Sequence, residues 1–106
     1  MPDIYYSPEA FGLEVALDVD KSSGCYEFDN FVIWHDPRVG DYLWAEDAGC
    51  SCPLPFGYVT VASARRGSLR DAINDARVWL GTRPSWDIEE WEAAKAAVDR
   101  FADGVR

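Results

Sequence analysis

The stretch LEVALDVD, Leu13 to Asp20, decides how the fold begins, because its apolar residues alternate with acidic or small ones. That alternation predicts a β-strand with one buried face. The turn sequence KSSG, Lys21 to Gly24, comes next, and YEFDNFVIWH, Tyr26 to His35, is an aromatic and β-branched run that predicts an antiparallel partner strand. A second turn, DPRVG at Asp36 to Gly40, leads into the third predicted strand, DYLWAE at Asp41 to Glu46. These residues therefore predict an antiparallel meander.

The rest of the chain predicts a loop, a short extended piece and two helices. Residues 47–57, DAGCSCPLPFG, have two Gly, two Pro and no periodicity, which is typical of a loop, and residues 58–62 predict an extended piece. Ser68 is a suitable N-cap for a helix that ends at Gly81, and a second helix is predicted from Trp86 to Ala102. Each helix has one apolar face, formed by Leu69, Ile73, Ala76 and Leu80 in the first and by Ile88, Trp91, Ala94, Val98 and Phe101 in the second.

We therefore predict one α+β domain over residues 1–106. An acidic β-meander with a Cys-containing loop occupies residues 1–62, and a helical hairpin occupies residues 68–103. The meander has three to four antiparallel strands, and the two C-terminal helices pack on one of its faces and leave the other exposed to solvent. On this arrangement Trp91 is buried against the sheet. A chain of 106 residues with five each of Trp, Tyr and Phe has the length and the apolar area for a single core.

Targeting signals and cysteine usage bear on where the protein acts. The sequence has no apolar run near the roughly 18 to 20 residues that a membrane span needs, and its first residues lack the basic start and apolar core of a signal peptide. We therefore expect a protein that is neither inserted in a membrane nor secreted. The cysteines, Cys25, Cys50 and Cys52, are odd in number, which fits free thiols in a reducing cytoplasm.

The acidic charge is concentrated in the first part of the chain. The formal net charge is −9, and residues 1–60 contain eleven acidic residues against Lys21 and Arg38. Residues 61–106 are balanced, with eight acidic and eight basic residues. A surface of this sign repels phosphate backbones and attracts basic partners. We expect no direct binding to nucleic acid.

Four segments of the chain resemble a known family. They are YYSPEAFGLE at residues 5–14, GCYEFD at residues 24–29, the pair Trp34 and Asp36, and GCSCPLPF at residues 49–56. Together they resemble a family of small uncharacterised proteins of tailed phages of actinobacteria, and the Gly-Cys-Ser-Cys-Pro motif is the specific part. The resemblance implies a phage genome and expression in the cytoplasm of a bacterial host. It supplies no catalytic residue.

One set of side chains has the chemistry of a metal site. Cys25, His35, Cys50 and Cys52 are the only thiols and the only imidazole in the chain, and three Cys with one His suit tetrahedral zinc. Against this, Cys-x-Cys is shorter than the usual ligand spacing, and Cys25 and His35 are expected at opposite ends of one strand, about 30 Å apart. The same cysteines could form a redox pair, although no basic residue adjoins them to lower a thiol pKa. We expect no cofactor and keep a zinc-stabilised or redox-active module as the alternative.

The sequence gives little support for an enzyme. It has a single His, no G-x-S-x-G motif and no Gly-rich phosphate loop. Arg65, Arg66 and Arg70 stand near the predicted helix start, where they can hold an anion or pair with Asp71, Asp75 and the acidic sheet.

The acidic sheet is the remaining candidate for a binding surface. Carboxylates and large apolar groups are expected together there, at Glu14, Asp18, Glu27, Asp29, Phe31 and Ile33. We interpret the chain as a non-enzymatic protein that binds a bacterial host protein through this face. A DNA-mimic inhibitor or a small enzyme ranks after the zinc or redox module, and a charge that merely keeps the protein soluble stays open.

Overall fold

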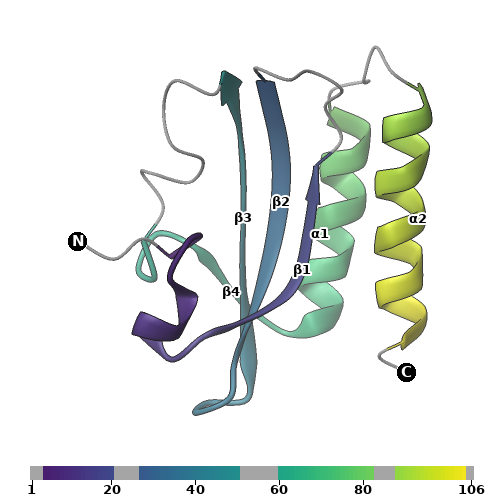
Figure 1. Ribbon diagram of the computed structural model, residues 1–106. Coiled ribbons are helices and arrows are strands. Elements are labelled where there is room, and N and C mark those ends of the chain that lie inside the picture. The colour runs from purple at the N-terminus through teal and green to yellow at the C-terminus, as the bar shows by residue number, and fades with distance from the viewer. Residues whose placement is uncertain (1–3, 21–26, 51–59, 83–87, 105–106) are drawn as a thin grey trace.

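A computed structural model describes residues 4–20, 27–50, 60–82 and 88–104 (Figure 1). In chain order the elements are the 3-10 helix η1 (Pro8–Phe11), β1 (Glu14–Asp20), β2 (Glu27–Asp36), β3 (Asp41–Cys50), β4 (Arg65–Gly67), α1 (Leu69–Thr82) and α2 (Ile88–Gly104). The strands form an antiparallel sheet in the order β1-β2-β3-β4, and both helices pack against it. The predicted α+β meander with two C-terminal helices is confirmed.

Strand β3 is longer than the six residues, Asp41 to Glu46, that the sequence predicted. Strands β2 and β3 pair over ten residues, from Asp36 opposite Asp41 to Glu27 opposite Cys50. The turn between them closes at Gly40, which has a positive φ of 86° and donates its N–H to the Asp36 carbonyl at 2.7 Å. Pairing along the whole of β2 extends β3 through Asp47 to Cys50, so the loop predicted from the two Gly, two Pro and missing periodicity of residues 47–57 is wrong for these residues.

The fourth strand is β4 and does not lie within residues 58–62. Residues 58 and 59 fall outside the described residues, and the chain from Thr60 to Ala64 turns back on itself, with the N–H of Ala64 donating to the Thr60 carbonyl at 2.9 Å. Strand β4 then pairs with Tyr42–Trp44 of β3. The extended piece predicted for residues 58–62 is therefore wrong over its described part.

The two helices bury one face of the sheet, as predicted. The Ser68 hydroxyl accepts the N–H of Asp71 at 3.2 Å and caps α1. The core on this side consists of Val19, Phe31, Ile33, Trp44, Ala72, Ala76, Trp79, Leu80, Ala94 and Val98. The rings of Phe31 and Trp79 pack with centroids 5.6 Å apart.

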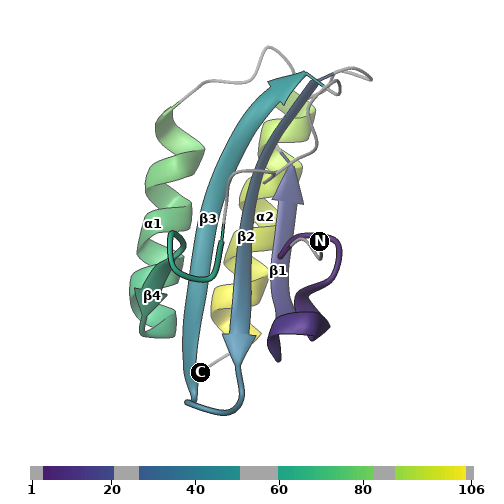
Figure 2. The ribbon, with the colours of Figure 1, turned by 90° about the vertical axis from the view of Figure 1, so that its left-hand side faces the viewer.

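The opposite face of the sheet is also covered, so the prediction that it faces solvent is wrong. The N-terminal segment with η1 and the loop before β4 lie on the side away from the helices (Figure 2). A second core forms there from Ile4, Leu13, Val32, Trp34, Leu43 and Ala45. The reason is visible in β2, where Phe31, Val32, Ile33 and Trp34 are consecutive and all 0% exposed. An unbroken apolar run is typical of a strand that is buried on both faces.

Indole N–H groups tie the helices to the sheet and to each other. Trp44 Nε1 donates to Asp75 Oδ2 at 2.7 Å, and Trp79 Nε1 donates to Asp29 Oδ1 at 3.0 Å. Trp91 donates to the Leu80 carbonyl at 2.7 Å and is half-buried. It therefore joins α2 to the end of α1, and the prediction that it packs into the sheet core is wrong.

Candidate functional site

The two apolar residues of the predicted docking face are not on the surface. Phe31 and Ile33 are 0% exposed and lie under the helices in the core. The two side chains share one face of β2, as their spacing predicted, and that face is the one that the helices cover. They therefore take no part in a surface that a partner reaches.

The four predicted acidic residues do not form one face either. Glu14 pairs with His35 and shares the helix side of the sheet, whereas Asp18 pairs with Val32 on the opposite side. A bulge between Val15 and Leu17 separates them, because one extra residue in β1 reverses the alternation. Asp29 is half-buried on the helix side. Glu27 lies at the start of β2, and its side chain is outside the described residues.

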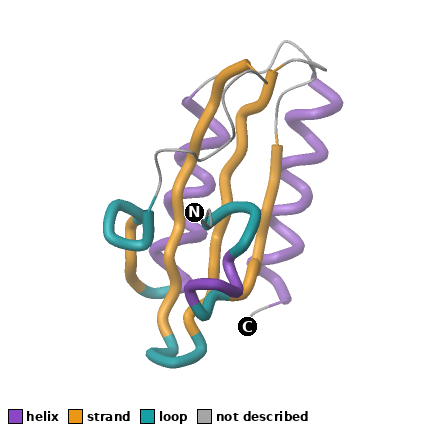
Figure 3. The backbone as a smooth tube through the Cα atoms, turned by 60° about the vertical axis from the view of Figure 1, so that its left-hand side comes forward, coloured by secondary structure: helices purple, strands orange, loops and turns teal. Residues whose placement is uncertain are grey.

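The structure instead gathers exposed carboxylates along β1. Glu14, Asp18 and Asp20 are exposed on this seven-residue strand, and we call them the acidic edge. Among the described strands, β1 is an outer strand of the sheet and pairs with β2 (Figure 3). The alternation in LEVALDVD was a sufficient signal for Asp20, which stands two residues after Asp18.

Neutral donors fix the central carboxylate of the acidic edge. Asp18 Oδ2 accepts from the Tyr5 hydroxyl at 3.0 Å, and Asp18 Oδ1 accepts from Asn30 Nδ2 at 3.1 Å. Burial and the neighbouring charge of Asp18 raise the pKa of Tyr5 well above its usual range, so the phenol stays protonated and keeps donating. These contacts orient Asp18 without cancelling its charge. Next to it, Asp20 Oδ1 accepts the N–H of Asp29 at 3.1 Å.

Arginines cluster at the other end of the sheet, near the β2–β3 turn. Asp36 is 2% exposed and binds Arg38 Nε at 3.3 Å and Arg66 at 3.4 Å. Burial opposes its ionisation, but the hydrogen bonds and charges of both arginines prevail and hold the pKa of Asp36 below its usual value. Arg66 also binds Asp41 at 2.6 Å, and this hydrogen bond is the main reason that the pKa of Arg66 is raised.

Arg65 also forms ion pairs with acidic residues, one of the two roles expected for the arginines near the start of α1. It contacts Glu46 at 3.1 Å and Asp75 at 3.2 Å. Arg65 and Arg66 are thus engaged by carboxylates of β3, β2 and α1, so neither is an anion site. The network links the turn, β4 and the first helix.

Two of the four predicted zinc ligands, His35 and Cys50, lie far apart on the sheet. His35 stands opposite Tyr42 and Cys50 opposite Glu27, near the two ends of the ten-residue β2–β3 ladder and about 25 Å apart along it. Zinc ligands lie about 2.0 to 2.3 Å from the metal, so His35 and Cys50 cannot share one ion. Cys25 and Cys52 fall outside the described residues. Within the part of the chain that the structure describes, no three His, Cys, Asp or Glu side chains are placed to hold a metal.

His35 has a different environment. Its ring stacks on Tyr42 with centroids 4.9 Å apart, and Nδ1 lies 3.7 Å from Glu14 Oε2. The His35 side chain is 30% exposed and Glu14 is 70% exposed, so this is a loose surface contact. Glu14, at the beginning of the acidic edge, is therefore held only weakly by His35.

Comparisons with known proteins bear on the family. Among the described helices, none is long and apolar enough to cross a membrane. Searches of curated proteins and of solved structures find no match to this chain. The model of one family, described as Domain of unknown function (DUF7574), matches residues 2–105, and the chain belongs to that family.

Proposed function

We propose that this chain is a non-enzymatic binding protein that holds a basic, extended segment of a partner protein along the acidic edge. The observation that carries the proposal is the placement of Glu14, Asp18 and Asp20 on the outer strand of the sheet. An outer strand offers backbone N–H and C=O groups to a strand added beside it, and side chains then set the choice of partner. Three carboxylates along that strand favour Lys and Arg in the added segment.

The geometry of β1 supports recognition of a segment rather than of a flat surface. The bulge between Val15 and Leu17 sends Glu14 toward the helix side and Asp18 toward the other side. Carboxylates therefore project on both sides of the same edge, where an extended peptide presents alternate side chains. Asp18 is held by Tyr5 and Asn30, so less side-chain entropy is lost when a basic group binds it.

The placement of the basic side chains also supports the acidic edge as the binding surface. Arg38, Arg65 and Arg66 are engaged with carboxylates around the β2–β3 turn and β4, at the far end of the sheet from Asp20. These arginines pair with Asp36, Asp41 and Glu46, whereas Asp18 on β1 accepts from the neutral side chains of Tyr5 and Asn30. Attraction by the acidic edge speeds encounter with a basic partner and weakens with salt, since the Debye length falls from about 10 Å at 0.1 M to about 3 Å at 1 M.

The biological setting is part of the proposal. The resemblance of residues 5–56 to small proteins of actinobacterial tailed phages supports a phage protein that acts in the cytoplasm of its bacterial host. The partner is then a host protein with an accessible basic strand or tail.

The test compares two variants with equal loss of charge. Glu14→Gln, Asp18→Asn and Asp20→Asn remove the charge of the acidic edge, and Glu89→Gln, Glu90→Gln and Glu92→Gln remove the same charge from exposed positions on α2. Each protein is used to capture partners from an actinobacterial lysate, followed by mass spectrometry. Affinity for the purified partner is then measured at 0.1 M and 1 M salt.

We expect the edge variant to lose the partner and the α2 variant to keep it, with weaker wild-type binding at high salt. Circular dichroism and thermal melts check that both variants fold. If the edge variant retains its partners and only becomes less soluble, the acidic edge serves solubility and the proposal is wrong.

A further inference from the structure

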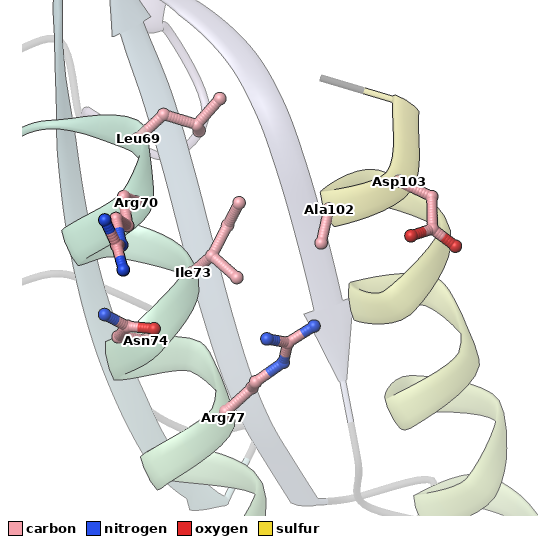
Figure 4. Close-up of a pocket in the computed structure, with 7 residues that line it drawn as sticks. All are labelled: Leu69, Arg70, Ile73, Asn74, Arg77, Ala102 and Asp103. Atoms are coloured by element: carbon pink, nitrogen blue, oxygen red, sulfur yellow. The ribbon is translucent and has the colours of Figure 1, made fainter. Parts of the chain in front are cut away.

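A groove between the two helices has a composition unlike the rest of this acidic chain. It has a volume of about 450 Å³ and is lined by Leu69, Arg70, Ile73, Asn74, Arg77, Ala102 and Asp103. Figure 4 shows Arg77 reaching from α1 toward α2, with Ala102 pointing back across the gap. The volume is within the range of about 300 to 1,000 Å³ that small-molecule sites occupy.

The wall of the groove on α1 is basic and polar. Arg70, Asn74 and Arg77 follow one another at helical spacing on α1, and in Figure 4 the Arg77 side chain extends toward α2 whereas those of Arg70 and Asn74 stay beside α1. Arg70 is exposed and forms no ion pair or hydrogen bond with any residue that the structure describes. Unlike Arg65 and Arg66, it is not engaged by the acidic sheet.

Arg77 is only loosely neutralised. Its Nη2 atom lies 3.6 Å from Asp99 Oδ1, beyond hydrogen-bond distance, whereas Lys95 Nζ lies 3.1 Å from Asp99 Oδ2. Asp99 is bound by Lys95 and more loosely by Arg77, so an anion in the groove would compete with Asp99 for the Arg77 guanidinium. Asp103 stands at the α2 rim as the single acidic lining residue.

We propose that this groove binds a small phosphate monoester whose organic part is apolar. Two guanidinium groups match the near-double negative charge of a phosphate monoester better than the single charge of a carboxylate. The Asn74 amide can donate to a further phosphate oxygen. The apolar part of the ligand rests on Leu69, Ile73 and Ala102.

The placement of the groove makes this inference independent of the acidic edge. It opens between α1 and α2, next to the N-terminal turn of α1, where the helix dipole also favours an anion. The acidic edge belongs to β1. The edge variant described above is therefore expected to bind the phosphate monoester as the wild type does, so that failure of one proposal leaves the other standing.

The experiment uses phenyl phosphate as the probe, with the full chain at 0.15 M salt, measured by calorimetry and by amide chemical shifts. Arg70→Ala and Arg77→Ala are each expected to weaken binding at least tenfold, because each removes a charge-assisted contact. The matched control is Arg100→Ala, an exposed arginine of α2 that does not line the groove, and it is expected to change affinity less than twofold. Shifts are expected in residues 69–77 and 102–103.

Three further probes decide the ligand class. Inorganic phosphate is expected to bind at least tenfold more weakly than phenyl phosphate, because it leaves the apolar floor uncovered, and benzyl alcohol is expected not to bind. Benzoate that binds as tightly as phenyl phosphate would overturn the assignment to a phosphate. An equal loss of affinity in Arg100→Ala, or shifts outside the groove, would show general attraction to anions and overturn the site.

Discussion

The bond between Trp44 and Asp75 is the sharpest test of how the helices are held on the sheet. Trp44 belongs to β3 and is 4% exposed, and its indole N–H donates to Asp75 of α1 at 2.7 Å. We consider Trp44→Phe, Asp75→Ala and the double variant. Phe keeps most of the buried ring but has no N–H, and Ala removes the acceptor.

The magnitude follows from what each change leaves behind. Asp75→Ala leaves a buried indole N–H without its acceptor, which costs about 1 to 3 kcal/mol, and the better helix propensity of Ala returns at most about 0.7 kcal/mol. The ion pair of Asp75 with Arg65 is partly exposed and adds at most about 1 kcal/mol. When Trp44 is already Phe, no buried indole N–H is left without an acceptor, so Asp75→Ala lowers the free energy of unfolding only slightly. We expect a coupling free energy of about 2 kcal/mol.

The assay is urea unfolding followed by far-UV circular dichroism, because the Trp44 variants change the fluorescence signal. Glu92→Ala on α2 serves as the control, since Glu92 is exposed and α2 packs against α1 and β1. Its coupling to Trp44→Phe is expected to vanish within about 0.5 kcal/mol, the usual limit of additivity for distant sites. A Trp44–Asp75 coupling below that limit would refute the reasoning that this bond fixes α1 on the sheet.

Four other predictions follow from single contacts. Trp91→Phe removes the hydrogen bond between the indole N–H and the end of α1 and is expected to lower the free energy of unfolding by about 1 kcal/mol in urea. A loss above about 3 kcal/mol would indicate that Trp91 is a core residue after all. Gly67→Ala places a Cβ 3.1 Å from the buried indole ring of Trp44 and is expected to destabilise the protein by about 1 to 3 kcal/mol. A Cβ at Gly81 has nothing within 4 Å, so Gly81→Ala is expected to stabilise α1 by up to about 1 kcal/mol. Equal effects of the two variants would contradict this packing. Asp36→Asn is expected to lower the melting temperature at pH 7. The pKa of Asp36 in the folded protein lies below its ordinary value of 3.8, so the stability that its charge adds is present above that value and is lost as pH falls through the folded-state pKa. A difference in melting temperature between the wild type and the variant that persists unchanged at pH 2 would argue against the arginine network as its cause. If zinc binds near Cys50, the purified protein is expected to contain about one zinc per chain and to melt at a lower temperature with a chelator, and metal-free protein that melts identically would end that hypothesis.

Only part of the candidate binding surface could be predicted from the sequence. The acidic excess of residues 1–60 follows from counting residues, so its sign and its place in the chain are predictable from the sequence alone. Which face each carboxylate occupies depends on the bulge between Val15 and Leu17, which arises when β1 meets β2. Phe31 and Ile33 were expected on a docking surface because nothing local distinguishes a strand face that meets a partner from one that meets a helix.

Local chemistry was enough for the elements that depend on neighbours in the chain. The alternation at Leu13 to Asp20, the DPRVG turn and the Ser68 cap each act within a few residues, and the structure has each where the sequence predicted it. Only the tertiary structure decided what joins residues far apart: the Trp79 bond to Asp29, 50 residues away, the covering of the second sheet face by Ile4 and Leu13, and the groove that sets Arg77 against Ala102. The physical reason is that periodicity reports which side of an element is apolar, whereas the partner of that side is chosen by packing among elements that local sequence does not encode.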